Sequence, residues 1–283
     1  MEFCFIILHY LTAKDTIECI DSIRKIHRGK EAQIIIVDNH SNNGSIEKVE
    51  EFIGNDSNYT VLKNAENVGF ARGNNVGYRF VKQNFGTPMV IILNNDTIIR
   101  QTDFLDKIEA AYAENHFAVL GPDIISLIDG GHQNPIGRIP NRSSVKKQIL
   151  KYRILLTLSR LGLYSTLQKR FGRSDAEKKL QTSKPQSKVL SNQALHGSCL
   201  VFSPIFCKAM DEAFCADTFL YKEEFILAKR CEEKNLKMVF DSEIEIYHKE
   251  DSATNMVVSS TKEKREFLFA NLVKSNTVLL KYM

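Results

Sequence analysis

The sequence contains no tryptophan, no Cys-x-x-Cys pair, no internal repeat and no apolar run long enough to cross a membrane. The missing tryptophan excludes nothing by itself. Met1 leads directly into the apolar run FCFIILHY without a basic segment before it, which does not fit a signal peptide. The six cysteines lie mostly in apolar runs and lack metal-ligand spacing, so we expect buried thiols and a reducing, cytoplasmic location.

Acidic residues are absent from one long segment. Between Arg142 and Arg173 there are nine Lys or Arg residues and no Asp or Glu, and the rest of the chain has 29 basic and 34 acidic residues. Leu and Ile recur at helical spacing within this segment, a composition typical of helices that lie on anionic bilayers. We expect residues 142–173 either to contact the inner face of a membrane peripherally or to pack on the catalytic body or a second subunit. No nucleic-acid partner is predicted.

What is present is an ordinary globular composition, with 43% hydrophobic and 25% charged residues over 283 positions. Helical spacing over 12–27, 45–52, 71–83 and 103–114 separates five strand-like runs: FCFIILH, QIIIVD, YTVLK, PMVIIL and FAVLG. This alternation predicts an α/β fold with a doubly wound, mostly parallel sheet. Ligands of such sheets bind where the carboxyl ends of the strands meet.

The second half is expected to begin with a loop over 122–140 and one or two basic helices, followed by a polar connection over 176–188. The pattern then predicts a strand over 197–203, a helix from Pro204, a helix over 222–234, strands over 237–241 and 244–248, and a helical tail over 261–282.

Polar residues follow three of the predicted strands at the point where each one ends. These residues are His9 and Tyr10, then Asp38 and Asn39, then Asn94, Asn95 and Asp96. One carboxylate at such an edge can accept hydrogen bonds from a nucleobase or a ribose, and another can hold a hard divalent cation. Either group alone is typical of turn residues, but the two together with the next motif favour a binding site.

That motif is NVGFARGNNVG, which begins at Asn67. Gly69 and Gly73 allow close backbone approach, while Asn74 and Asn75 offer amide donors and acceptors. Its position after the third strand and its spacing do not fit a dinucleotide G-x-G-x-x-G turn. The alternative interpretation is a helix start whose glycines serve packing.

The segments LHY, VDNHSNNGS, NAENVGFARGNN and VIILNNDTII together resemble the family 2 glycosyltransferases, in particular the rhamnosyltransferase-like enzymes of surface polysaccharide synthesis. Three later segments, HGSCLVFSP, FLYKEEFILAKR and IYHKEDSAT, are similar to that family's acceptor strand, acidic-pair helix and late histidine. The resemblance covers about residues 3–122 and 194–254. Its asparagine–glycine motif and LNND strand end are fairly specific, and the later segments are specific only in combination and order.

The resemblance implies a GT-A fold and inverting transfer from a nucleoside-diphosphate sugar. Asp38 and the segment from Asn67 to Asn74 would contact the nucleobase, and Asn94 or Asn95 would contact the ribose. Asp96 and His248 would hold Mg²⁺ or Mn²⁺ at the diphosphate, where the cation would neutralise the charge of the leaving group.

One residue of the pair Glu223 and Glu224 would be the general base that takes the acceptor's hydroxyl proton. Glu224 is the first choice because it aligns with the usual Asp of the family's Glu-Asp pair. The longer Glu side chain is a departure from that pattern, and so is Asn43 at a position where Asp is common. Taken singly, Glu223 and Glu224 would be an ordinary solvated helix start, and His248 a strand-end histidine.

The sequence therefore predicts a GT-A-like fold with a helical insertion and a C-terminal helix. Its parts are a nucleotide-sugar-binding half (1–122), a loop and basic helical insertion (123–193), an acceptor half (194–254) and a helical tail (255–283). The expected partners are a UDP- or dTDP-sugar and a glycan or lipid-linked acceptor, and a homodimer is left open. The alternatives are a nucleotidyltransferase, disfavoured because LHYLTAKDT is no basic, Gly-rich loop, and a non-catalytic module that binds a sugar nucleotide or glycan.

Overall fold

The computed structural model describes residues 1–164, 184–250 and 261–283. Within them, one nine-stranded sheet has the order β3-β2-β1-β4-β10-β6-β11-β5, and β8 pairs with β11. The first four strands of this order are parallel: β3 (Tyr59–Lys63), β2 (Gln33–Asp38), β1 (Phe3–His9) and β4 (Met89–Asn94). β7 (Gly137–Arg138) and β9 (Gln193–Ala194) form a separate small sheet.

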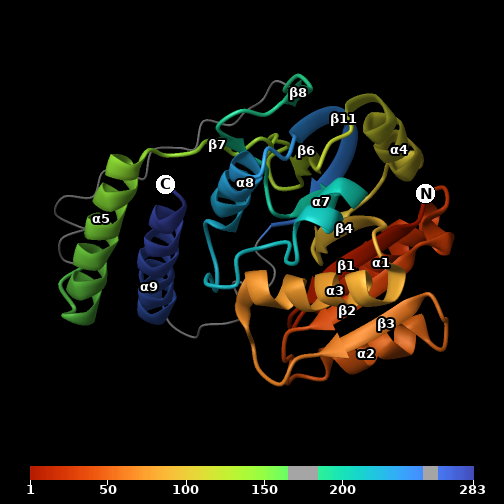
Figure 1. Cartoon of the computed structure of the whole chain (residues 1–283). Coiled ribbons are helices and arrows are strands. Elements are labelled where there is room, and N and C mark those ends of the chain that lie inside the picture. Colours follow the sequence, from red (N-terminus) through yellow and green to blue (C-terminus); the bar gives the residue numbers. More distant parts are fainter. Residues whose placement is uncertain (165–183, 251–260) are drawn as a thin grey trace.

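Helices cover both faces of the large sheet, so the predicted doubly wound α/β architecture is confirmed (Figure 1). One face packs on α1 (Ala13–Lys25), α2 (Ser45–Ile53) and α4 (Phe104–Asn115). The other packs on α3 (Gly69–Phe85), α7 (Pro204–Ala209) and α8 (Glu223–Glu233). β1 shows the alternation that this requires, because Phe5 and Ile7 enter the first core and Cys4 and Ile6 the second.

The centre of the sheet differs from the expected parallel succession. β10 (Cys199–Phe202) lies between β4 and β6 (Val119–Ser126) and runs antiparallel to both. A strand from the second half of the chain thus joins the two ends of the sheet. Strand order depends on pairing between segments about 80 residues apart or more, which no local pattern encodes.

Several elements differ from those that the sequence predicted. The two strands expected over 237–248 are one strand, β11 (Met238–His248), with a register shift between Asp241 and Glu245 against β6. The loop expected from residue 122 begins later because β6 continues to Ser126, where pairing with β11 satisfies its backbone. Four short strands were not predicted: β5 (Thr97–Ile98) and β8 (Lys188–Val189), which both pair antiparallel with β11, and β7 and β9, which pair with each other.

A helical pair lies beside the sheet domain. α5 (Arg142–Arg160) begins where the Asn141 side chain accepts the Ser144 backbone N–H at 2.8 Å. It packs along α9 (Thr261–Leu279), which continues into the short helix η2 (Leu280–Tyr282). Figure 1 shows both helices on the side of the molecule opposite the N-terminus. A third small core of α5, α8 and α9 residues joins them to the body.

Some predictions fall outside the described residues: the end of the basic segment to Arg173, most of the polar connection over 176–188, and the Ser and Thr after His248. All six cysteines are buried free thiols, as expected. Within the described ranges, no helix combines the length and the apolar content that crossing a membrane requires.

Candidate functional site

The carboxyl ends of β1, β2 and β4 meet at one edge of the sheet, so the polar residues that end these strands are neighbours. His9 is in register with Asp38, and Leu8 is in register with Asn94. Sequence positions separated by about 30 to 85 residues are thereby brought together. We describe this edge first, then the groups that β10, β11 and α8 add to it.

His9 lies beneath the edge rather than on it. The side chain is fully buried, and its ring nitrogens lie 2.7 Å from Thr16 Oγ1 and 2.9 Å from Ser45 Oγ. Burial lowers the pKa of His9, against the opposing effect of Asp38. Asn95 joins the same network, because its Nδ2 donates to Thr16 Oγ1 at 3.0 Å. His9 and Asn95 therefore connect β1 and β4 to α1, while Tyr10 and Asn94 are half-buried at the edge.

Asp38 and Asn39 organise the loops around the predicted nucleobase site. Both oxygens of Asp38 accept the Ser41 backbone N–H at 3.2 Å. Asn39 donates to Asn67 Oδ1 at 2.9 Å and accepts the Val68 backbone N–H at 3.1 Å. Asn39 thus holds the loop before α3, a role that the sequence did not reveal because it looked like an ordinary turn residue.

The glycines of the asparagine–glycine motif serve close packing. Gly69 has φ +82°, and a Cβ there would lie 2.3 Å from the Phe219 carbonyl oxygen. A Cβ at Gly73 would lie 2.6 Å from Leu8 Cδ1, so Gly73 lets α3 approach β1. At Gly73 the structure shows this packing, and the predicted contact of the motif with a substrate stays a prediction.

The two asparagines of the motif differ in their surroundings. Asn75 binds the Phe214 backbone twice, donating to its carbonyl at 2.8 Å and accepting its N–H at 2.9 Å. Asn74 donates to the Phe70 carbonyl at 3.0 Å, and its buried Oδ1 has no hydrogen-bond partner among the described residues. The motif therefore attaches α3 to the loop that precedes α8.

Asp96 and His248, both predicted to hold a metal, are brought together by the pairing of β5 with β11. Asp96 Oδ1 lies 3.3 Å from His248 Nε2, and both side chains are 10% exposed. Gln133 Oε1 lies 2.9 Å from His248 Nδ1. With Gln133 Oε1 accepting from Nδ1, a neutral ring would direct the lone pair of Nε2 at the Asp96 carboxylate.

This pair fits a divalent cation. Two ligands in adjacent positions of an octahedron, each about 2.1 Å from the ion, lie about 3 Å apart. A cation between Nε2 and the carboxylate would also remove the repulsion between them, as protonation of His248 would. Across the described residues, no group of three or more His, Cys, Asp or Glu side chains converges on a metal position.

The tripeptide before β10 connects this pair to the acidic pair. The rings of His196 and His248 lie 5.7 Å apart between centroids, and the Ser198 carbonyl accepts the Asn94 backbone N–H at 2.9 Å. A Cβ at Gly197 would lie 3.1 Å from Glu224 Oε1. Gly197 therefore leaves room for Glu224 beside the strand ends. The sequence indicated a strand here but not this contact.

Glu223 and Glu224 begin α8 after an unusual turn. Tyr221 and Lys222 both have left-handed backbone, with φ +74° and +70°. Such conformations cost about 1–3 kcal/mol each for residues with a Cβ and are concentrated at functional sites. This turn sets the direction in which α8, with the acidic pair in its first turn, leaves the loop.

The two carboxyl groups are in different environments. Glu223 is 2% exposed, and burial together with the neighbouring Glu224 charge raises its pKa to about 8. Glu224 is only half-buried, and burial raises its pKa against the opposing effects of backbone hydrogen bonds and Lys222. Glu224 is therefore the less enclosed residue of the pair and lies next to Gly197, while Glu223 is buried.

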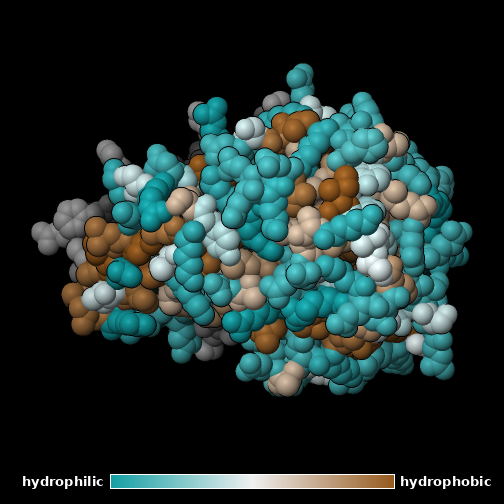
Figure 2. All heavy atoms as spheres, viewed as in Figure 1, coloured by the Kyte–Doolittle hydropathy of each residue, from teal (hydrophilic) through white to brown (hydrophobic). Residues whose placement is uncertain are grey.

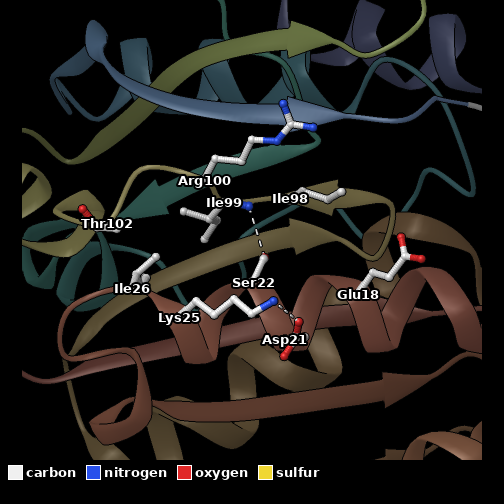
Figure 3. Close-up of a pocket in the computed structure, with 9 residues that line it drawn as sticks. All are labelled: Glu18, Asp21, Ser22, Lys25, Ile26, Ile98, Ile99, Arg100 and Thr102. Atoms are coloured by element: carbon white, nitrogen blue, oxygen red, sulfur yellow. Dashed lines mark hydrogen bonds and ion pairs between the residues drawn. The ribbon is translucent and has the colours of Figure 1, made fainter.

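A separate groove of about 520 Å³ lies between α1 and the segment after β5. Figure 3 shows Ser22 hydrogen-bonded to the Ile99 backbone and an Asp21–Lys25 ion pair, with Arg100 and Glu18 also on the lining. Opposite charges on this lining neutralise one another. None of the predicted site residues lines the groove, so we do not assign the activity to it.

The sequence profile of the family described as Glycosyl transferase family 2 matches residues 4–168, more than half of the 283 residues. The chain belongs to this family. Among curated proteins none matches it closely enough to count as a relative. The match covers the strand ends and the asparagine–glycine motif but not the acidic pair or His248, which lie beyond it.

Several solved glycosyltransferases share the fold of this family 2 member. S. aureus TarS 1-349 in complex with UDP-GlcNAc is 17% identical with a TM-score of 0.57, over 96% of this chain and 65% of that one. The mannosyltransferase PcManGT from Pyrobaculum calidifontis, in complex with GDP-Man and Mn²⁺, is 13% identical with a TM-score of 0.55, over 99% and 72%.

GalNAc-T7 with UDP, GalNAc and Mn²⁺ is 15% identical with a TM-score of 0.61, over 95% of this chain and 47% of that one. Against a longer TarS chain, this protein spans 37% of the length. At these identities the likeness shows the fold, which is GT-A, as the sequence predicted.

Proposed function

We propose that the protein transfers a sugar from a nucleoside-diphosphate donor to a hydroxyl group of a glycan or lipid-linked acceptor, with inversion at the anomeric carbon. The observation that carries this proposal is the convergence of three groups at one sheet edge. Asn94 ends β4, the Asp96–His248 pair lies beside it, and Glu224 lies across Gly197. Family membership and the fold support the same reaction class.

In this proposal Asp38 and the loop from Asn67 to Gly69 bind the nucleobase, and Asn94 or Asn95 binds the ribose. Tyr10 lines the donor side, and His9, Gly73 and Asn74 shape the site from beneath. A uracil or thymine donor is favoured by the resemblance, and the related S. aureus structure carries UDP-GlcNAc. The rhamnosyltransferase-like branch of surface polysaccharide synthesis remains our proposal for the sugar, on the strength of the NVGFARGNN and LNND motifs.

Asp96 and His248 would hold Mg²⁺ or Mn²⁺, as the Mn²⁺ in two similar folds supports. Such a cation supplies charge neutralisation at the diphosphate. Glu224 accepts the proton of the acceptor hydroxyl while the new carbon–oxygen bond forms, and the electron pair of the broken bond goes to the diphosphate oxygen. Glu224 lies on the accessible side, as a base that must reach an incoming acceptor should.

The test is a panel of UDP-, dTDP- and GDP-sugars with Mn²⁺, with Mg²⁺ or with EDTA, measuring nucleoside-diphosphate release. We expect release with a UDP- or dTDP-sugar that EDTA abolishes and Mn²⁺ restores. NMR of the product then reports whether the anomeric configuration is inverted. Binding of UDP without release from any donor would favour a non-catalytic binding module instead.

The described part of the basic segment supports the proposed membrane contact through residues 142–173. Leu150, Ile154 and Leu161 are 50–66% exposed. At 100° per residue they fall within about 40° of arc, on the side of α5 opposite its buried face. α5 therefore has two apolar faces, one packed on α9 and one exposed. Figure 2 shows apolar surface gathered at that end of the molecule.

Cations flank the exposed stripe on both sides, and α5 contains no acidic residue. The flanking residues are Arg142, Lys146, Lys147, Lys151, Arg153 and Arg160. A second copy docking through the same face would bring like charges together. An anionic lipid surface complements both the apolar stripe and the cations, so we propose it as the partner, with the homodimer as the alternative outcome of the test.

A further inference from the structure

The loop that directly precedes the acidic pair, residues 210–222, is bound by two helices, α3 and α9. On one side α3 binds it: the Phe70 backbone N–H donates to the Phe219 carbonyl at 2.8 Å, and Arg72 Nε donates to the Ala216 carbonyl at 2.7 Å. These contacts come from the first turns of the helix that begins at the proposed nucleobase loop. The donor side of the site is therefore connected directly to this loop.

On the other side the C-terminal helix binds the loop. The fully buried Ser275 Oγ donates to the Leu220 carbonyl at 2.7 Å. Lys281 pairs with Asp217 at 3.1 Å, and the Phe267 and Phe219 rings lie 6.0 Å apart between centroids. Two successive carbonyls, of Phe219 and Leu220, are thus fixed by two helices that are about 200 residues apart in sequence.

The position of these bonds gives Ser275 its importance. Leu220 directly precedes Tyr221 and Lys222, the two residues with left-handed backbone, and Glu223 and Glu224 follow at once. A strained turn keeps its shape only while its surroundings hold it. Once the Leu220 peptide is free to rotate, the following turn can relax and carry Glu224 away from Gly197.

We propose that Ser275 is a positioning residue for the reaction, acting through the Leu220 carbonyl to hold Glu224 at the sheet edge. This inference rests on the proposed role of Glu224 as base. It assigns the C-terminal helix a part in catalysis through its contact with the loop before α8. A displacement of about 1 Å can cost roughly 100-fold in rate, so a modest shift of the turn is enough.

The central variant is Ser275→Ala, and Thr277→Ala is its matched control. Thr277 is on the same helix, is exposed, and donates to the Val273 carbonyl at 2.8 Å without touching the loop. Hydrogen–deuterium exchange is measured on the full chain with UDP and Mn²⁺. We expect Ser275→Ala to accelerate exchange at residues 219–224 while β1 keeps its protection, and Thr277→Ala to change neither.

Kinetics with the UDP- or dTDP-sugar that the panel identifies then test the connection to the base. Ser275→Ala should lower kcat roughly 10- to 100-fold with an unchanged donor KM. Ser275→Thr, which keeps the hydroxyl, should restore most of it. In a Glu224→Gln background the same change should have little further effect, because the two residues act as one unit.

The proposal is wrong if Ser275→Ala leaves hydrogen exchange at residues 219–224 unchanged. It is also wrong if Ser275→Ala lowers kcat equally in the wild-type and in the Glu224→Gln background. A donor panel without any turnover overturns the proposed reaction and the base assignment with it. The exchange experiment still reports separately whether Ser275 holds the turn.

Discussion

Neighbouring residues with the same side chain have different chemistry here. Glu223 is buried and Glu224 borders Gly197, because adjacent positions on a helix point about 100° apart. Their pKa values are both raised by burial, yet Glu223 is a buried residue and Glu224 a half-buried one. Residue-scale predictions therefore separate the two members of the pair.

Glu224→Gln should lower kcat by about 10²–10⁴-fold, the usual effect of removing a general base. Affinity for UDP with Mn²⁺ should be unchanged, because the diphosphate side of the site is intact. Glu223→Gln should retain much more activity, since a glutamine replaces a carboxyl group whose pKa is already raised. Steady-state kinetics on both variants decide between them. If Glu223→Gln is inactive and Glu224→Gln is active, the base is Glu223 and not Glu224.

Glu223 also predicts how stability depends on pH. Its folded pKa of about 8 exceeds the ordinary value of 4.5, so the folded protein keeps a proton that the unfolded chain releases between these values. Stability falls as pH rises through that window. Glu223→Gln should therefore gain stability relative to wild type between pH 5 and about 8. Urea unfolding at several pH values measures this, with the exposed Glu51→Gln as control. If the difference in unfolding free energy between Glu223→Gln and wild type does not change with pH, the Glu223 carboxyl is not buried in its protonated form.

The Asp96–His248 pair predicts where a metal binds. Asp96→Ala and His248→Ala should each weaken Mn²⁺ binding in the presence of UDP by at least about tenfold, because each removes one of two ligands. Gln133→Ala should have a smaller effect, since it only orients the histidine. Titration calorimetry measures the affinities, with Asp103→Asn, whose side chain is 48% exposed, as control. Unchanged Mn²⁺ affinity in both ligand variants would exclude this pair as the metal site.

At the scale of elements, the motif at the start of α3 makes contacts with two different parts of the protein. α3 begins with the asparagine–glycine motif, and the structure uses Gly73 for contact with β1 and Asn75 for attachment to the loop before α8. A motif that looks like a ligand-binding loop therefore also acts as the joint between the two halves of the site. A change at Asn75 therefore loosens the attachment of α3 to the loop before the acidic pair.

α5 gives the element-scale prediction. Liposomes with anionic lipid should bind the protein at low salt, and neutral liposomes should not. Changing Lys146, Lys147, Lys151 and Arg153 to Gln should weaken binding, and changing Leu150 and Ile154 to Ser should weaken it independently of salt. Co-sedimentation measures both, and light scattering reports a dimer. A wild-type protein that ignores anionic liposomes at low salt, or a dimer lost on changing the two apolar residues, would contradict membrane docking.

At the scale of the whole molecule, the sheet makes the proposed halves interdependent. β6 reaches β4 only through β10, which comes from the second half of the chain. The family match ends at residue 168, before β10 begins. A fragment of residues 1–168 would leave β4 and β6 with unpaired, apolar edges, which promote aggregation.

We therefore expect the fragment 1–168 not to fold as a soluble monomer, while the full chain does. Size-exclusion chromatography and circular dichroism measure this. A cooperative unfolding transition of the monomeric fragment would show instead that the first half is an independent domain, as the division at residue 122 allows.

Much of the fold follows from local pattern. The apolar run QIIIVD is buried throughout β2 except for its first residue, and helical spacing over 12–27 became α1. The convergence of Asp38 and Asn94 followed from parallel strands alone, because their carboxyl ends share one edge. The residue roles that were missed, those of Asn39, Gly197 and Ser275, depend on contacts with distant segments and leave no local signal.

The sequence by itself therefore determined the class of fold, the sheet edge where the predicted site residues meet and the types of residue available there. Hydrophobic periodicity and the polarity of strand ends are local properties of the sequence, which are the same in the folded and the unfolded chain. Only the tertiary structure decided which groups meet. His248 faces Asp96, and Glu224 rather than Glu223 borders Gly197 at the sheet edge. Ser275 of the C-terminal helix binds the Leu220 carbonyl, directly before the turn that leads into the acidic pair. These outcomes depend on the packing of segments far apart in sequence, where burial and backbone geometry, rather than residue type, set each side chain's neighbours.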